Sequence, residues 1–355
     1  MTSWPFAPPI SPMEARVKED WPAGDWAYEP KWDGFRVVCW SADADGPRLD
    51  SRNHKPLLRY FPELEEPLRT LPAGTVVDGE VVAVRARRLD FDTLSERIHP
   101  AQSRIQLLAE RTPAELVAFD LLAQDGRDLR SAPFRARRRG LEQLLSDLAP
   151  PWHLTPSTTD AQVGRRWFDE FESAGCDGIV AKLLDGPYVD GQRAMVKLKH
   201  RRTVDCVVGG YRVHKDGPQA GVGSLLLGLY DHHGRLHFLG HCSNFSDQER
   251  VALHARLQDL RVDAGRGTGG GDAFEQGARR PGEPSRWTGN KDLSWVALEP
   301  ELVCEVSYGQ LTNGRFRHAT RFERWRPDKE PAECTLDQLE RPEGPTFRQV
   351  VATAT

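Results

Sequence analysis

The chain has 355 residues, of which 39% are hydrophobic and 28% charged, and its formal net charge is −4. At about 150 residues per domain, this length predicts two to three soluble domains with sizeable cores and excludes a mini-protein. No apolar run approaches the ~20 residues that cross a bilayer, and the Pro-rich start lacks the basic and apolar segments of a signal peptide. We therefore expect a cytoplasmic protein with no membrane partner.

Cysteine usage and charge exclude several other classes of protein. The six cysteines are scattered singly, without a C-x-x-C pair or a Cys/His cluster at zinc spacing. A disulfide framework or a structural zinc site is therefore not expected, and each thiol is predicted to be a small buried hydrophobe. The net charge gives no global attraction to nucleic acid, although local clusters can still build a basic face.

The first 202 residues are predicted to mix strands with a few helices. In chain order, the predicted elements are a strand on each side of Lys31 within 25–42, a strand, an Asp-Gly turn and a strand over 74–84, a short helix at 91–98, a strand at 115–123, helices at 133–148 and 160–175, and strands at 176–184 and 194–200. The helix at 133–148 is amphipathic, with leucines at i, i+3, i+4 and i+7. Its first turns carry a basic group that either contacts phosphates or forms a solvated face, namely Arg135, Arg137, Arg138 and Arg139.

After about residue 202 the pattern changes to short, regularly spaced β-segments separated by Gly and polar turns. These segments lie at 205–213, 223–231, 236–243 and 301–309, and they predict a small antiparallel barrel. One helix at 245–260 interrupts them, with Ser246 as its N-cap. The Gly-rich stretch 263–284 has no apolar periodicity and is predicted to be a flexible surface insertion.

The most informative segment is EPKWDGFR, residues 29–36, in which Lys31 lies between two predicted strands with an acidic residue and an arginine nearby. One interpretation is a hairpin with an Asp-Gly turn and a surface lysine. The other makes Lys31 a covalent nucleophile, which needs a deprotonated amine and hence neighbouring cations or a metal that lower its pKa. Such cations should then occur elsewhere in the chain.

Two later segments supply them. DGIVAK, residues 177–182, places Asp177 and Lys182 on one strand. MVKLKH places Lys197 and Lys199 two residues apart, so that both amines face the same side of a strand. The adjoining apolar residues indicate a partly buried strand, where alternate lysines are costly unless an anion lies between them. The pattern favours an anion site over a solvated strand face.

Seven segments together resemble, in order, the motifs of ATP-dependent DNA ligases, which belong to the covalent nucleotidyltransferase superfamily of ligases and RNA-capping enzymes. The segments are EPKWDGFR (29–36), SRNHKPL (51–57), VVDGEVV (76–82), VAFDLL (117–122), CDGIVAK (176–182), MVKLKH (195–200) and RHATRFERWRPDK (317–329). The resemblance covers most of the chain and implies an α+β fold: an ATP-grasp-like nucleotidyltransferase domain of antiparallel sheets with flanking helices, followed by an all-β OB-fold barrel. The chain is most similar to short bacterial repair and end-joining ligases, including the ligase C type.

The resemblance also implies roles for individual residues. Lys31 would attack the α-phosphate of ATP to form lysyl-AMP, and Lys197 and Lys199 would hold the α-phosphate oxygens as further catalytic residues. The implied nucleotide-binding residues are Glu29, Arg36, Arg52, Glu80, Phe119, Lys182, Arg321, Arg324, Asp328 and Lys329. Glu80 and Asp177 would hold Mg²⁺ or Mn²⁺. The family usually has glutamate in place of Asp177, so the shorter carboxylate implies metal binding through water.

These implications define the expected organisation and function. We expect an adenylation domain at 1–202, an OB-fold domain at 203–341 and a C-terminal tail at 342–355, in a monomeric, nucleoid-associated enzyme that seals nicked duplex DNA. A repair polymerase or an end-joining factor is the expected protein partner. NAD⁺ use is not expected, because only a few tens of residues precede Lys31. The alternatives are an RNA ligase or capping-type nucleotidyltransferase, and a non-catalytic OB-fold nucleic-acid-binding protein.

Overall fold

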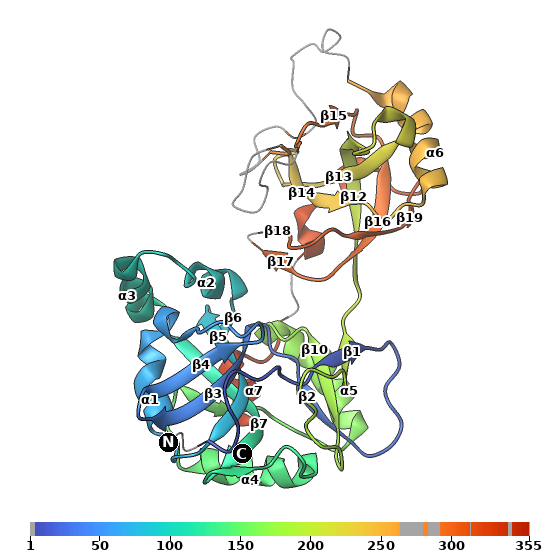
Figure 1. Ribbon diagram of the computed structural model, residues 1–355. Helices are drawn as coiled ribbons and strands as arrows, with labels where there is room; N and C mark the ends of the chain where they lie inside the picture. The colour runs from blue at the N-terminus through green and yellow to red at the C-terminus, as the bar shows by residue number, and fades with distance from the viewer. Residues whose placement is uncertain are drawn as a thin grey trace. The chain divides into compact units, whose positions relative to one another are not determined.

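The computed structural model describes residues 4–262, 274, 280–282, 292–312, 314–339 and 343–354, and it divides into two compact units (Figure 1). Unit 1 comprises Met1–His200 and Arg341–Thr355, and unit 2 comprises Arg201–Glu340. The chain therefore leaves unit 1 after residue 200 and returns to it after residue 340. No helix in the described ranges is long and apolar enough to span a membrane.

The larger sheet of unit 1 has seven strands. They are β3 (Phe35–Asp43), β4 (Gly46–Ser51), β5 (Val76–Arg85), β6 (Arg88–Leu89), β7 (Ala114–Gln124), β8 (Arg127–Asp128) and β9 (Trp152–Leu154). The order is β4-β3-β5-β7-β8, with β6 on β5 and β9 parallel to β7. Helices α1 (Glu65–Arg69) and α4 (Phe134–Ser146) pack on this sheet, and their leucines share one apolar cluster with it. Strands β5 and β7 are rich in buried aliphatic residues because apolar clusters cover both of their faces.

The smaller sheet of unit 1 has four strands in the order β1-β11-β10-β2. These are β1 (Ala15–Val17), β2 (Trp26–Pro30), β10 (Gly178–Leu183) and β11 (Met195–Lys199), and only the β1–β11 pair is parallel. Helix α5 (Ala161–Glu170) packs on β2 and β10. Two further short helices, α2 (Phe91–Glu96) and α3 (Gln102–Arg111), complete the unit. The strands predicted on each side of Lys31 and at 115–123, 176–184 and 194–200 are confirmed, as are the predicted helices.

The predicted Asp-Gly turn within 74–84 is wrong, because this segment forms the single strand β5. The register of β5 on β7 shifts between Asp78 and Gly79, which marks a local irregularity rather than a reversal of the chain. A Cβ atom at Gly79 would lie 2.7 Å from the Val117 carbonyl oxygen. The glycine is therefore required by the close approach of β7, and not by a turn.

Unit 2 is a six-stranded sheet in the order β14-β13-β12-β16-β19, with β15 on β12 and a separate β17–β18 hairpin. Its strands are β12 (Arg202–Val213), β13 (Val222–Tyr230), β14 (Leu236–Cys242), β15 (Val296–Ala297), β16 (Val303–Tyr308), β17 (Leu311–Thr312), β18 (Arg315–Phe316) and β19 (Arg321–Trp325). An isolated bridge between Cys242 and Thr320 joins the two edges, so the sheet closes on itself. Helix α6 (Asp247–Leu257) begins with the predicted Ser246 cap, here part of a full capping box. The expected α+β fold with a C-terminal β-rich, OB-like region is confirmed.

The expected Gly-rich insertion at 263–284 falls almost entirely outside the described residues. Phe274, within that stretch, is described and is buried in the core of unit 2 between Phe238 and Trp295. At least this residue of the stretch is therefore a core residue rather than part of a surface loop. All six cysteines are free and buried, as the sequence predicts, and burial raises the pKa of the Cys176 thiol far above its ordinary value.

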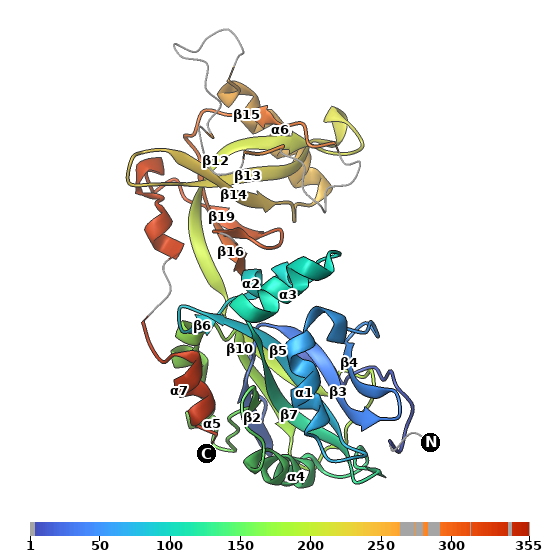
Figure 2. The same cartoon turned by 90° about the vertical axis from the view of Figure 1, so that its left-hand side faces the viewer.

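Residues 343–354, expected as part of a tail, contain helix α7 (Phe347–Ala352) and belong to unit 1. Figure 2 shows α7 beside β6, and the Phe347 backbone N–H donates to the Arg87 carbonyl oxygen at 2.9 Å. Phe347 and Val350 are completely buried. This segment is part of the core of unit 1.

Candidate active site

Unit 1 contains a cavity of about 200 Å³ whose walls come from both of its sheets. Strands β2, β10 and β11 of the smaller sheet and β3, β5 and β7 of the larger sheet each contribute lining residues. The predicted site residues that line the cavity are Glu29, Lys31, Arg36, Arg52, Glu80, Phe119, Lys182 and Lys197. The structure therefore brings together residues that are up to 168 positions apart in the sequence, and it places Lys31 in a cavity wall rather than on an open hairpin.

The position of Lys31 is fixed by its backbone. Its N–H donates to the Gly178 carbonyl oxygen at 2.9 Å, and its own carbonyl oxygen accepts from the Asp177 N–H at 2.8 Å. Gly178 has a φ of +129°, and a Cβ there would lie 2.0 Å from the Leu198 carbonyl oxygen, so only glycine fits. The Asp-Gly pair of the 176–182 segment thus ties the lysine to the smaller sheet.

The Asp177 carboxylate is buried and lies between two amines. Its Oδ2 is 3.0 Å from Lys31 Nζ and 2.8 Å from Lys199 Nζ. Burial opposes the charged carboxylate, but Lys31 and Lys199 outweigh it and lower the pKa of Asp177. Burial likewise opposes the Lys31 ammonium, and Asp177 outweighs it and raises the pKa of Lys31. The lowered pKa that the sequence predicts for Lys31 is therefore wrong for this state, because the nearest charge is a carboxylate and not a cation. Lys31 is a protonated, paired amine here, and Asp177 must release it before it can act as a nucleophile.

Lys197 lies in a different electrostatic environment. Its pKa is lowered by burial and by the charges of Lys199, Lys31 and Arg52. Among the described residues, no carboxylate lies within ion-pair distance of its amine. A half-buried lysine surrounded by other cations is costly unless an anion shares the site, so this corner of the cavity is suited to phosphate.

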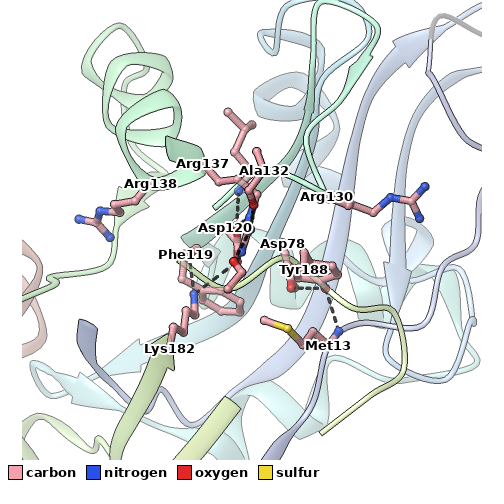
Figure 3. Close-up of polar contacts among 12 residues, drawn as sticks. Met13, Asp78, Phe119, Asp120, Arg130, Ala132, Arg137, Arg138, Lys182 and Tyr188 are labelled. Atoms are coloured by element: carbon pink, nitrogen blue, oxygen red, sulfur yellow. Dashed lines mark hydrogen bonds and ion pairs between the residues drawn. The ribbon is translucent and has the colours of Figure 1, made fainter. Parts of the chain in front are cut away.

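Arg36 is anchored to the cavity wall by Asp78. Its Nε and Nη2 donate to the two carboxylate oxygens of Asp78 at 2.6 Å each, and the Arg36 guanidinium lies 4.5 Å from the Phe119 ring centroid. The Tyr188 hydroxyl donates to Asp78 at 2.6 Å and accepts from the Met13 N–H at 3.0 Å, as Figure 3 shows. Glu80 lies near this group, and burial raises its pKa to about 7.

A second buried network lies behind Phe119. The Lys182 amine is 2.9 Å from Glu29 Oε2, donates to the Phe119 carbonyl oxygen at 2.6 Å, and lies 4.8 Å from the Phe119 ring centroid. Burial raises the pKa of Glu29, although Lys182 and Arg138 oppose this. Oxygen Oε1 of Glu29 has no hydrogen-bond partner among the described residues, although Nη1 of Arg138 lies 3.6 Å from it. It is a buried acceptor in the cavity wall that a ligand amino group could satisfy.

Two of the helix arginines predicted to face phosphates or solvent do neither. Arg137 is buried on α4 and makes a bidentate ion pair with Asp120, with donor–acceptor distances of 2.7 and 3.1 Å. Figure 3 shows Asp120 between Arg137 and Lys182. Arg138 is also buried; it pairs with Glu142 of the same helix, and its Nη1 lies 3.6 Å from Oε1 of Glu29 on β2. An arginine can enter a core where a carboxylate on a neighbouring strand matches it, and the local pattern of the helix does not reveal that partner.

The basic run at 317–329 belongs to unit 2, whereas the cavity residues belong to unit 1. Arg321 and Arg324 are exposed on β19, and Arg324 pairs with Glu305 at 2.6 Å. Lys329 pairs with Asp205 at 2.9 Å, and Asp328 pairs with Arg326. In this structure Arg324 and Lys329 are held by carboxylates of their own unit, and Asp328 is held by an arginine of that unit.

Sequence reasoning missed the N-terminal wall of the cavity. Residues 12–15 line it, although the sequence predicts only an extended lead-in. Residue Met13 is held there by Tyr188 and by Arg36, whose Nη2 donates to the Met13 carbonyl oxygen at 3.3 Å. Parallel pairing of β1 with β11 fixes the same segment. The contacts with Tyr188 and with β11 span 175 residues or more, so no local signal in the sequence identifies them.

The candidate metal ligands fit a metal that binds together with phosphates. Among the described residues, no group of three or more His, Cys, Asp or Glu side chains is arranged to hold a metal ion. Asp177 and Glu80 offer carboxylate oxygens, which suit Mg²⁺, and Mg²⁺ in proteins often uses one or two carboxylates plus substrate phosphates. The amines now paired with Asp177 would have to move for that carboxylate to take part.

Comparison with known proteins finds matches over most of the chain. Residues 9–199 match the family model of the ATP dependent DNA ligase domain, and residues 218–329 match that of the ATP dependent DNA ligase C terminal region. DNA ligase C1 of Mycolicibacterium smegmatis is 48% identical over 351 residues, covering 95% of this chain and 96% of that protein. DNA ligase C of Mycobacterium tuberculosis is 47% identical over 345 residues, with the same coverage.

More distant matches extend the comparison. A multifunctional non-homologous end joining DNA repair protein, LigD of Mycobacterium tuberculosis, is 33% identical over 320 residues, which cover 89% of this chain and 38% of that protein. A solved structure from an analysis of Lig E DNA ligases has a TM-score of 0.53 at 16% identity, covering 88% of this chain and 99% of that one, and shows likeness of fold alone. On the two family models and the full-length similarity, the chain belongs to the ATP-dependent DNA ligases.

Proposed function

We propose that this ATP-dependent DNA ligase seals nicks through a lysyl-AMP intermediate on Lys31. The observation that carries the proposal is the position of the Lys31 amine, paired with Asp177 in the wall of a cavity lined by Lys197 and Arg52. In the first step Lys31 Nζ gives up a proton to solvent and attacks the α-phosphorus of ATP. A P–N bond forms, the bond to the pyrophosphate oxygen breaks, and pyrophosphate leaves with the electron pair.

The other cavity residues act by positioning and by electrostatics. Lys197 and Lys199 face the phosphates and stabilise the charge that builds on the α-phosphate oxygens. Phe119 stacks on adenine, and Glu29 Oε1 accepts a hydrogen bond from the adenine amino group. Arg36, Arg52 and Glu80 fix the ribose and phosphates, and Lys182 holds Glu29. A Mg²⁺ or Mn²⁺ ion at Glu80 and Asp177 would neutralise phosphate charge.

The later steps act on DNA. AMP passes from Lys31 to the 5′-phosphate of a nick, and the 3′-hydroxyl then attacks that phosphate and releases AMP. We assign residues 1–202 to adenylation and 203–341 to the OB-fold domain. The similarity to ligases named C1 and C, and to an end joining protein, supports a role in repair with a polymerase or end-joining factor as partner. The preferred substrate is a nicked duplex with 3′-hydroxyl and 5′-phosphate ends.

Nucleotide labelling tests this proposal against the RNA-ligase, capping and non-catalytic alternatives. Incubation with α-labelled ATP and Mg²⁺ should label the protein, and α-labelled GTP should not. Labelled protein should then seal a nick in duplex DNA faster than a nick in duplex RNA. Labelling by GTP, or the absence of any labelling, would refute the proposed reaction.

Titration of Glu80 should make the first step depend on pH near neutrality. Because burial raises the pKa of Glu80 to about 7, this carboxyl is protonated below that pH and loses the negative charge that a cation requires. The rate of lysyl-AMP formation should rise as pH passes through about 7, while the stabilising effect of the bound proton is lost over the same range. Rates are measured by rapid-quench labelling at saturating ATP.

The matched variant is Glu80→Gln, which keeps the shape of the side chain and removes its titration. This variant should be slower by about 10- to 100-fold above neutrality and should lose the inflection. Lys31, whose pKa is raised, titrates at much higher pH and does not produce this inflection. Retention of the inflection near neutrality in Glu80→Gln would assign it to another group.

The basic run of unit 2 should act chiefly in the first step. If Asp328 and Lys329 orient pyrophosphate, then Asp328→Ala and Lys329→Ala should slow lysyl-AMP formation by about 100-fold while sparing the sealing of a pre-adenylated nick. Asp205→Asn is the control. Asp205 holds Lys329 at 2.9 Å within the unit, so this variant removes that ion pair and keeps Lys329 itself. Equal losses in both assays would show that the run serves stability or DNA binding instead.

A further inference from the structure

Helix α7 packs directly behind the proposed nucleophile. Phe347 of α7 makes an edge contact with Trp32, with ring centroids 5.8 Å apart and an interplanar angle of 73°. Trp32 follows Lys31 in the chain and is buried. Its indole N–H donates to Thr155 Oγ1 at 2.9 Å, so hydrogen bonding and ring packing both fix this side chain. The residue next to the reacting lysine is therefore held in place partly by the end of the chain.

The same apolar cluster reaches other parts of the site. It contains Phe347 and Val350 from α7 together with Trp32, Cys176 and Phe119. Cys176 precedes Asp177, whose backbone and carboxylate both contact Lys31. Phe119 lines the cavity. A change in the packing of Phe347 thus bears on three segments that surround the Lys31 amine.

The docking of α7 is specific rather than a loose cover. Arg348 Nη2 donates to Glu115 at 2.7 Å, and the Ser173 hydroxyl donates to the Pro345 carbonyl oxygen at 2.8 Å. The Thr346 side chain and Gln349 form a capping box that starts the helix. Polar contacts on both sides of Phe347 therefore set the depth at which its ring enters the cluster. A positioning role requires such a fixed depth, whereas simple coverage of an apolar face does not.

We propose that Phe347 is a positioning residue for Lys31: packed against Trp32, it holds the Lys31–Trp32 backbone where the amine can reach the α-phosphorus of ATP. This inference rests on the proposed role of Lys31. Near-attack geometry is sensitive to small displacements, and a shift of about 1 Å caused away from the reacting atoms can cost about 100-fold in rate. The C-terminal segment is on this account part of the adenylation machinery, although it lies 316 residues beyond Lys31 in the chain.

The test compares Phe347→Ala with Phe61→Ala in the full-length protein. Both phenylalanines are completely buried in unit 1, but Phe61 belongs to the cluster that lies against α1 and α4 and does not contain Trp32. Lysyl-AMP formation is measured at saturating labelled ATP, at a temperature where circular dichroism shows every variant to be folded. Sealing of a pre-adenylated nick, which does not use the Lys31 amine as nucleophile, is measured on the same samples.

We expect Phe347→Ala to slow lysyl-AMP formation by about 10- to 100-fold and to leave the sealing rate unchanged. Phe61→Ala should retain the wild-type labelling rate, and Phe347→Leu should recover part of the loss. If Phe347→Ala does not fold, Phe347→Leu against Phe61→Leu decides by the same criterion. Equal labelling by the Phe347 and Phe61 variants, or equal loss of labelling and sealing, would overturn the inference. Failure of the wild-type protein to label at Lys31 would instead refute the proposed function itself.

Discussion

Lys31→Ala should abolish labelling of the protein by ATP and leave measurable sealing of pre-adenylated nicks. Removal of a covalent nucleophile typically costs on the order of 10⁶-fold, so lysyl-AMP should fall to background. The final step needs only the phosphate-binding cationic side chains and the adenylate already attached to the nick. The variant keeps those side chains. The measurement pairs a labelling assay with a sealing assay on a synthetic nick that already carries 5′-AMP.

Lys199→Ala is the informative comparison for that variant. Lys199 shares the Asp177 carboxylate with Lys31, with its amine 2.8 Å from Oδ2, but in the proposed mechanism it does not become adenylated. Labelling should therefore be slowed in Lys199→Ala and absent in Lys31→Ala. Normal labelling of Lys31→Ala would remove the basis for the assigned nucleophile, and peptide mapping would then identify the residue that carries AMP.

Arg137→Met should destabilise unit 1 by about 3–5 kcal/mol, the usual cost of leaving one partner of a buried ion pair without the other. Arg137 and Asp120 are each 1% exposed, so little water reaches the carboxylate that remains. Urea unfolding followed by tryptophan fluorescence measures the change. Seven of the ten tryptophans lie at residues 4–167 in unit 1, so the signal reports mainly on that unit.

The double variant Arg137→Met/Asp120→Leu provides the control for that prediction. Replacement of a whole buried pair by apolar residues is often neutral, so the double variant should recover most of the lost free energy of unfolding. Lys182 keeps its ion pair with Glu29 in the single variant and in the double variant. A double variant no more stable than Arg137→Met would show that the pair itself is not the source of the effect.

Local patterns in the sequence predict much of the fold and of the candidate site, because the reactive side chains lie on strands or at their ends. The strands around Lys31, the alternate lysines at 197 and 199, and the capped helix after Ser246 each follow from spacing over fewer than about ten residues. The cavity in unit 1 brings the Lys31 segment and the strand that carries Lys197 together. Asp177, one methylene shorter than the usual glutamate, still reaches both Lys31 and Lys199.

What the sequence could not predict depends on contacts between distant segments. Together with the preceding aspartate, Gly79 predicts a turn. Instead, the close approach of β7 across the sheet requires glycine at this position. Arg137 has the appearance of a surface residue until Asp120 of a neighbouring strand is placed beside it. Phe347 lies in a short C-terminal segment with no strong pattern, and its importance follows only from the position of Trp32.

The central claim is that Lys31 carries AMP on the way to a sealed nick, and a single-turnover chase tests it most directly. The protein is labelled with α-labelled ATP, freed of nucleotide and mixed with an excess of nicked duplex DNA. We predict that label leaves Lys31, appears briefly on the 5′ end of the nick and is released as AMP, with one strand sealed for each label lost. Label that stays on the protein while DNA is sealed would contradict the claim, as would sealing that requires ATP to be present throughout.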